Sequence, residues 1–234
     1  HSLGGAGSVA ANIGALGATP HCVGISGDDR DADRMSTLLQ AAGADASGII
    51  RTKSRPTTRK TRLIGMAQHR HRQQLIRIDD EVAAPFEDVA ALTAHVTRLL
   101  PMCQAICIED YNKGVITPAS AQAIIAAAKA RGVPVLVDPA SISDYRRYAG
   151  ATVITPNRTE TERAIGGERL RNIDAVRTAA RKIHQACHAE CICVTLDAEG
   201  SALIGPEGAC EHIKTIERDV YDVTGAGDAV LAAM

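Results

Sequence analysis

The second half of the chain alternates short, continuously apolar runs with longer stretches in which apolar residues recur at helical spacing. The apolar runs, rich in Ile, Val, Ala and Cys, are 105–110, 133–138, 151–155 and 191–195. The stretches that predict helices are 85–100, 118–131, 144–148, a segment from 160, and 173–187. Apolar strands separated by helices are typical of a parallel sheet covered on both faces. We therefore expect an α/β domain built around a mainly parallel sheet.

The first part of the chain has a similar order. A glycine-rich turn at 4–7 precedes a helix of small residues. Residues 21–26 then predict a buried strand, and a second helix ends at Gly43. These elements extend the α/β pattern to the start of the sequence.

Residues 47–80 differ, because three strand-like segments follow one another without a helix between them. The segments are 48–51, 60–66 and 74–79, and charged residues partly alternate along them. Such strands are expected to pair antiparallel, as an insert or lid outside the parallel sheet. The default interpretation of the basic loop at 68–73 is a solvated turn. The alternative is that its donors face an anionic substrate.

Length and charge narrow the class of protein. A chain of 234 residues can bury the core of one domain, so we predict a single domain over residues 1–234 with its lid at about 47–80. A net charge of −1, with four Tyr, one Phe and no Trp, argues against nucleic-acid binding. No apolar run approaches the roughly 18 residues of a membrane span, so no membrane partner is expected. Because the sequence starts at His1 rather than Met, we expect the full chain to be longer.

The seven cysteines are an odd number in a sequence without a visible secretion signal. This favours reduced thiols in a cytoplasmic protein. The segment 187–193 carries three of them and a histidine, which raises a metal site as an alternative. Cys191 and Cys193 lie within a predicted strand, and no second ligand pair has zinc-like spacing, so a structural role is favoured.

The last residues carry the most informative chemistry. The turn 224–227 consists of small residues, and Asp228 opens an apolar helix. Backbone N–H groups exposed at a helix start favour an anion such as a phosphate. A carboxylate in the first helical turn could then take a proton from a hydroxyl group beside that phosphate. This pattern indicates phosphoryl transfer to an alcohol, and the alternative is an ordinary capped helix with an acidic first turn.

Polar residues also follow four predicted strands, at 110–114, 138–139, 157–160 and 195–200. Ligands of parallel α/β sheets bind beyond these carboxyl ends. Asn157 and Glu160 are three residues apart at a helix start, so their oxygens suit a hydrated Mg²⁺. A helix cap in which the same two residues bind each other is an equally good interpretation.

A second motif, Gly5-x-Gly7-x-x-Ala10, fits the dinucleotide-binding pattern and raises an NAD-dependent oxidoreductase as another class of function. The preceding strand that would support this pattern is not in the sequence. A turn that lets the backbone approach a sugar closely is the alternative.

Taken in order, these motifs resemble the ribokinase-like (PfkB) carbohydrate kinases over essentially the whole chain. The motifs are the Gly4-Gly5 turn, Gly27-Asp28-Asp29, the β lid, Asp138-Pro139, Asn157-x-x-Glu160 and Asp222-x-Thr224-Gly225-Ala226-Gly227-Asp228. The resemblance implies a three-layer α/β/α fold with a small antiparallel β lid, and a homodimer formed through that lid. It also implies ATP as phosphoryl donor and Mg²⁺ as cofactor.

The resemblance further assigns roles to individual residues. Asp228 is implied as the catalytic base. The residues implied to form the anion hole are Gly225, Ala226 and Gly227. Those implied to organise Mg²⁺, mainly through water, are Asn157 and Glu160, and those implied to border the nucleotide are Thr195 and Gly200. The residues implied to hold the sugar are Gly4, Gly5, Lys60, Arg62, Gln74, Arg77 and Asp110.

Within the family, segments 57–62, 72–79, 110–114 and 148–152 resemble the kinases that phosphorylate heptose 7-phosphate for ADP-heptose synthesis. The basic groups implied to meet the substrate phosphate are Lys60, Arg62, Arg72 and Arg77. Two residues depart from the pattern: Ser8 replaces the Asn of the first signature, and Ala140 replaces a Lys of heptose kinases. A PfkB kinase for ribose, fructose phosphate or nucleosides, and a non-catalytic sugar- or nucleotide-binding module, are the alternatives.

Overall fold

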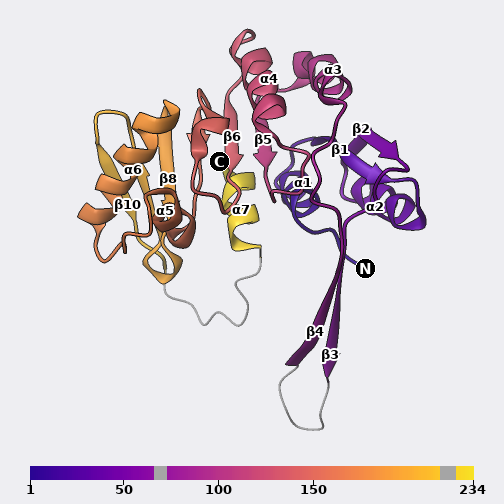
Figure 1. The fold of residues 1–234 in the computed structure, drawn as a ribbon, viewed down its shortest axis with the longest axis horizontal. Coiled ribbons are helices and arrows are strands. Elements are labelled where there is room, and N and C mark those ends of the chain that lie inside the picture. Colours follow the sequence, from indigo (N-terminus) through magenta and orange to yellow (C-terminus); the bar gives the residue numbers. More distant parts are fainter. Residues whose placement is uncertain (66–72, 217–224) are drawn as a thin grey trace.

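The computed structural model describes residues 1–65, 73–216 and 225–234. Six strands form the main sheet in the order β10-β9-β8-β7-β6-β5 (Figure 1). The parallel strands are β5 (Ile106–Glu109), β6 (Val135–Asp138), β7 (Val153–Ile154) and β8 (Cys191–Thr195). They confirm the four predicted apolar strands. Two antiparallel strands that the pattern did not predict, β9 (Ser201–Ile204) and β10 (Cys210–Ile213), complete the sheet.

Helices cover both faces of this sheet, as β6 shows. Val135 and Val137 belong to the large core cluster with α3 (Val89–Leu99), α4 (Pro118–Lys129) and α6 (Ile173–Cys187). Leu136 between them packs with Val9 and Leu231 instead, on α1 (Ala6–Ala15) and α7 (Ala226–Ala233). Because side chains alternate between the faces of a strand, the two clusters lie on opposite sides of the sheet. The predicted three-layer α/β/α fold is therefore confirmed.

Side-chain caps set where several of the helices begin. Asp88, Thr117 and Asn172 accept backbone N–H groups in the first turns of α3, α4 and α6. The first of these corrects the predicted start at residue 85, because the cap at Asp88 begins α3 at Val89. The short helices are η1 (Leu100–Met102), η2 (Tyr145–Tyr148), α5 (Arg158–Ala164) and η3 (Asp197–Glu199).

The assignment of residues 48–51 to the lid is wrong. They belong to β2 (Asp45–Thr52), which pairs parallel with β1 (His21–Gly27). Helix α2 (Arg30–Ala41) connects these strands, and a helical crossover returns the chain parallel. A side chain at Gly48 would lie 2.6 Å from the Cys22 carbonyl, so the close strand contact requires glycine here.

The lid itself is a two-stranded antiparallel hairpin of β3 (Arg59–Gly65) and β4 (Gln73–Asp80). Figure 1 shows the hairpin extending away from the sheet and its helices. The predicted basic loop, including Arg72, lies mostly outside the described residues. No helix in the described segments is long and apolar enough to cross a membrane.

Candidate active site

The site is organised around the start of α7. Gly225 caps this helix with a positive φ of 83°, a conformation that glycine adopts without strain. Asp228 lies in the first turn and is 9% exposed. A side chain at Gly227 would lie 3.6 Å from Asp138 Oδ2, so the turn runs close to the end of β6. The preceding motif residues Asp222 and Thr224 lie outside the described part of the chain.

Three carboxyl groups meet at this point. Oxygens of Glu109, Asp138 and Asp228 all lie within 4.8 Å of one another. Glu109 and Asp138 are the last residues of β5 and β6 and are partners in the parallel register. Asp138 was named from the sequence as part of the polar strand end 138–139, without a role as a ligand, and Glu109 was not singled out. Their position at the carboxyl ends of neighbouring strands was the available signal.

Burial and neighbouring charges raise the pKa of two of these carboxyl groups, Glu109 and Asp138. Burial raises the pKa of Glu109 to about 8, and the charges of Asp138 and Asp228 contribute to the rise. The pKa of Asp138 is raised to about 7 by burial, with further contributions from Glu160 and Asp228. The raised pKa values favour a bound proton, or a cation that balances the charge, at this site.

Tyr111 connects this group to the start of the chain. Its hydroxyl donates to Asp228 Oδ1 at 3.2 Å, and burial together with the neighbouring carboxylates raises its pKa. Its ring lies beside Gly5, where a Cβ would be only 3.0 Å from Tyr111 Cε2. Gly5 caps α1 with a φ of 54°. The first glycine turn and the last helix thus meet at one site, and a contact of Gly5 with a sugar stays a prediction. The sequence offered no signal for Tyr111 beyond its place after β5.

Asn157 and Glu160 form a reciprocal helix cap. The Glu160 N–H donates to Asn157 Oδ1 and the Asn157 N–H donates to Glu160 Oε2, both at 2.9 Å. The capping interpretation is therefore correct. The cap occupies the single amide oxygen of Asn157 and one of the two carboxylate oxygens of Glu160. The Glu160 charge still reaches Asp138, whose pKa it helps to raise. Burial raises the pKa of Glu160 itself.

The carboxylates fit the divalent cation that the family resemblance implies. Glu109 Oε1 is buried and has no hydrogen-bond partner among the described residues. A buried oxygen without a donor is costly, and hard cations prefer oxygen ligands. Among residues 1–65, 73–216 and 225–234, the candidate cluster of metal ligands is Glu109, Asp138 and Asp228. Cys187 and Cys193 are buried core residues, which supports their structural interpretation.

Thr195 and Gly200 frame the end of β8. Thr195 forms an isolated bridge with Asn157 and donates its N–H to the Pro156 carbonyl at 3.0 Å. Gly200 has a φ of 94°, and a Cβ there would be 2.0 Å from the Ile213 carbonyl. The tight turn between β8 and β9 is therefore sufficient reason for a glycine at position 200. Contacts of either residue with a nucleotide stay a prediction.

The predicted sugar-binding residues of the lid lie on the hairpin rather than in the carboxylate group. Lys60 pairs with Asp79 and Glu81, and Arg77 pairs with Asp79. Arg62 lies directly opposite Arg77, and Gln74 lies opposite Ile64. Glu81 also pairs with Lys113, which ties the base of the hairpin to the loop that carries Tyr111.

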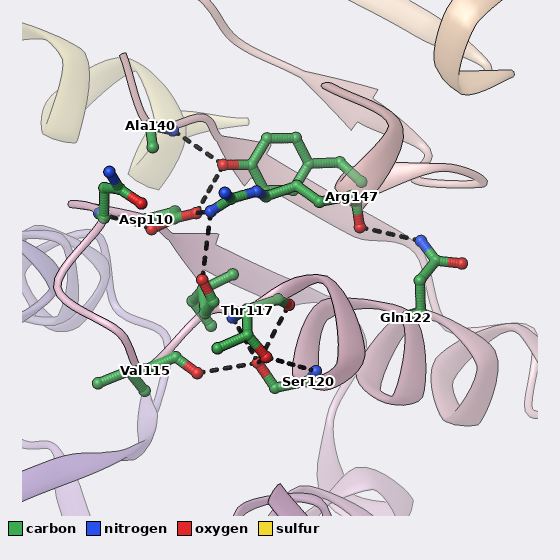
Figure 2. Close-up of polar contacts among 10 residues, drawn as sticks. Asp110, Val115, Thr117, Ser120, Gln122, Ala140 and Arg147 are labelled. Atoms are coloured by element: carbon green, nitrogen blue, oxygen red, sulfur yellow. Dashed lines mark hydrogen bonds and ion pairs between the residues drawn. The ribbon is translucent and has the colours of Figure 1, made fainter. Parts of the chain in front are cut away.

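The substrate contact predicted for Asp110 is not supported by the structure. Its side chain is 1% exposed, and Oδ2 accepts from Tyr148 Oη at 2.6 Å and from Arg147 Nη1 at 3.0 Å. Its other oxygen accepts the Asn112 N–H at 2.7 Å. Figure 2 shows Asp110 and Arg147 in this network, on the side where α4 begins. Internal donors therefore bind both oxygens.

Comparison with known proteins gives a consistent result. The model for "pfkB family carbohydrate kinase" matches residues 1–234. "Bifunctional protein HldE" from Pseudomonas fluorescens is 41% identical over 232 residues, 99% of this chain and 46% of that protein. The protein of the same name from Wolinella succinogenes is 38% identical over 235 residues, 100% of this chain and 48% of that protein. The chain thus spans about half the length of these relatives.

Solved structures agree on the fold. Escherichia coli phosphofructokinase-2, in a tetrameric inhibited form, superimposes with a TM-score of 0.77 at 20% identity. That match covers 98% of this chain and 73% of the other. Arabidopsis thaliana ribokinase, complexed with ribose and ATP, gives a TM-score of 0.74 at 21% identity over 97% of this chain and 71% of the other.

Proposed function

The chain belongs to the pfkB family of carbohydrate kinases, and from this premise we propose that it transfers the γ-phosphoryl group of ATP to D-glycero-β-D-manno-heptose 7-phosphate. The acceptor is the anomeric hydroxyl, and the product is the 1,7-bisphosphate used for ADP-heptose synthesis. The observation that carries the proposal is the placement of Asp228 at the start of α7, beside the ends of β5 and β6. The HldE proteins that match the whole chain support this choice of sugar.

Asp228 acts in this proposal as the general base. Its carboxylate takes the proton of the sugar hydroxyl as that oxygen attacks phosphorus. The N–H groups at the start of α7, at Gly225, Ala226 and Gly227, stabilise the charge of the transferred group, because a helix start favours an anion. Base and anion hole belong to the same helical turn, so one element positions both.

The cation would be held by this chain's own carboxylates. Glu109 and Asp138 would bind Mg²⁺ directly. Asn157 and Glu160, the two residues of the α5 cap, would act through water. When bound, Mg²⁺ neutralises phosphate charge. Thr195 and Gly200 would border ATP at the end of β8, while Gly4 and Gly5 would approach the sugar.

The lid supports a homodimer as part of this proposal. Leu63, Ile76 and Ile78 lie on one face of the hairpin and are 57%, 50% and 58% exposed. The opposite face carries the charged pairs of Lys60, Arg62, Arg77 and Asp79. A two-stranded hairpin with an uncovered apolar face is marginally stable alone, so a second copy would cover it. The charged face is then available to the sugar phosphate.

All seven thiols are unpaired, which supports a place in the cytoplasm.

A coupled ADP-release assay of the intact protein tests the activity. The acceptors are heptose 7-phosphate, ribose, fructose phosphates and nucleosides, each with ATP and MgCl₂. We expect the highest kcat/KM with heptose 7-phosphate. A higher value for another acceptor would reassign the substrate. Thermal stabilisation by NAD but not ATP, or binding of ATP and sugar without turnover, would instead favour the alternative classes.

A further inference from the structure

Three consecutive residues at the end of β5 alternate between opposite sides of the chain. Glu109 and Tyr111 face the start of α7, where Tyr111 donates to Asp228. Asp110 between them is turned away and buried against Tyr148 and Arg147. This alternation follows from the extended backbone at the end of the strand. Any shift of Asp110 would therefore move both of its neighbours.

The Tyr148 hydroxyl connects the ends of two strands. It donates to Asp110, after β5, and accepts the backbone N–H of Ala140, after β6, at 3.0 Å. Tyr148 is 0% exposed, so this hydroxyl has no water to replace either contact. Asp138, two residues before Ala140, is the register partner of Glu109. One buried hydroxyl thus fixes the loops behind both of these active-site carboxyl groups.

Arg147 holds the network from the other side. Its Nη1 donates to Asp110 and to the Ile116 carbonyl, and its guanidinium lies 5.9 Å from the centre of the Tyr148 ring. The carbonyl of Arg147 accepts from Gln122 of α4, as Figure 2 shows. The turn behind the site is therefore anchored to the helical layer.

The Asn112 contact extends this control to Tyr111. Asn112 has a φ of 54°, an uncommon conformation for a residue with a side chain. Its N–H is bound by Asp110 Oδ1, which stabilises the tight turn directly after Tyr111. The turn sets the direction of the Tyr111 side chain toward Asp228.

We propose that Asp110, Tyr148 and Arg147 form a clamp that positions Tyr111, Glu109 and Asp138 around Asp228. These three clamp residues act as positioning residues and do not contact the reacting atoms. The inference rests on the proposed function for its kinetic consequence, while the geometry can be tested without any activity.

The chain offers a matched pair of variants. Tyr148→Phe removes the hydroxyl that joins the two strand ends. Tyr145→Phe removes the hydroxyl of the neighbouring buried ring, which has no hydrogen-bond partner among the described residues. For Tyr148→Phe we expect kcat to fall about tenfold to a hundredfold with little change in the KM for ATP, because misplacement of about 1 Å has that effect. Tyr145→Phe should stay within about twofold of the wild type.

Crystal structures of both variants give the readout that is independent of catalysis. In Tyr148→Phe the Tyr111 hydroxyl should move out of hydrogen-bond distance of Asp228, and in Tyr145→Phe it should stay. If Tyr148→Phe does not fold, Asp110→Asn, which keeps the shape and removes the charge, serves in its place. An unmoved Tyr111 in the clamp variant would overturn the proposal whatever the activity. Wild-type protein that phosphorylates no sugar, with Tyr111 displaced in the variant, would instead reject the proposed function and retain the clamp.

Discussion

Glu109 and Asp138 are register partners at the ends of two adjacent parallel strands, and oxygens of their carboxyl groups lie within 4.8 Å of one another and of an Asp228 oxygen. Such an arrangement opposes folding when all three groups are ionised, because like charges at short distance repel one another. It becomes favourable when protons or a cation compensate the charge. The free energy of unfolding should therefore depend on pH through this site.

The first prediction concerns stability against pH. The pKa of Glu109 is raised from 4.5 to about 8 and that of Asp138 from 3.8 to about 7. The folded protein thus retains protons that the unfolded chain has released, so the free energy of unfolding falls as pH rises from about 4 to 8. Glu109→Gln removes part of this dependence. In thermal melts without Mg²⁺, the variant should melt above the wild type at pH 8 and close to it at pH 5.

A control at an exposed position makes this measurement specific. Glu211 on β10 is exposed, so Glu211→Gln should leave the difference between the two pH values unchanged. Adding MgCl₂ at pH 8 should stabilise the wild type more than Glu109→Gln. A wild-type melting temperature that is the same at pH 5 and pH 8 would contradict the raised pKa of Glu109.

Much of the fold could be predicted, because hydrophobic pattern reports burial directly. The runs that became β5, β6, β7 and β8 are apolar on both sides, as strands between two helical layers must be. The hairpin β9–β10 was not predicted, because the apolar run of β9 is only three residues long (202–204) and β10, at the sheet edge, is mostly exposed. Residues 48–51 were misassigned because pairing with β1 depends on a crossover, not on the local sequence.

Part of the candidate site could also be predicted from the sequence, and part could not. The turn before Asp228 is visible in sequence, since glycine and small residues mark a backbone that must approach something closely. The opposite roles of Glu109, Asp110 and Tyr111 are not visible, because three consecutive polar residues give no sign of which faces the ligand. The donors that hold Asp110 inward include Tyr148 and Arg147, 38 and 37 residues away in the chain, and the local sequence gives no sign of them.

The second prediction tests the base. Asp228→Asn keeps the size of the side chain and the acceptor for Tyr111 but cannot take a proton. We expect turnover to fall by about a thousandfold, within the range for removal of a general base, with the Kd for ATP changed little. ADP release and calorimetric ATP titration measure the two quantities. Turnover equal to that of the wild type would remove Asp228 from the mechanism.

The third prediction separates steric overlap from backbone strain at two glycines. Gly200 and Gly17 have φ values of 94° and 90°, but only Gly200 would place a Cβ against another atom, the Ile213 carbonyl at 2.0 Å. Gly17→Ala should cost about 1 kcal/mol through strain alone. Gly200→Ala should cost about 3 kcal/mol, because overlap is added to the strain. Urea denaturation of both variants measures the free energy of unfolding, and equal losses would show that the turn relaxes.

The fourth prediction concerns the second copy expected on the lid. Leu63 and Ile76 are directly opposite each other on the exposed apolar face of the hairpin, so a charge there must be desolvated if another hairpin covers it. Ile76→Asp should therefore convert a dimer into a monomer in sedimentation equilibrium. Leu16→Asp is the matched control, because Leu16 is 65% exposed on a different element at the end of α1. This control should leave the dimer intact. A wild-type protein that sediments as a monomer at micromolar concentration would mean that the apolar face of the lid serves another purpose, and a dimer that survives Ile76→Asp would place the interface elsewhere.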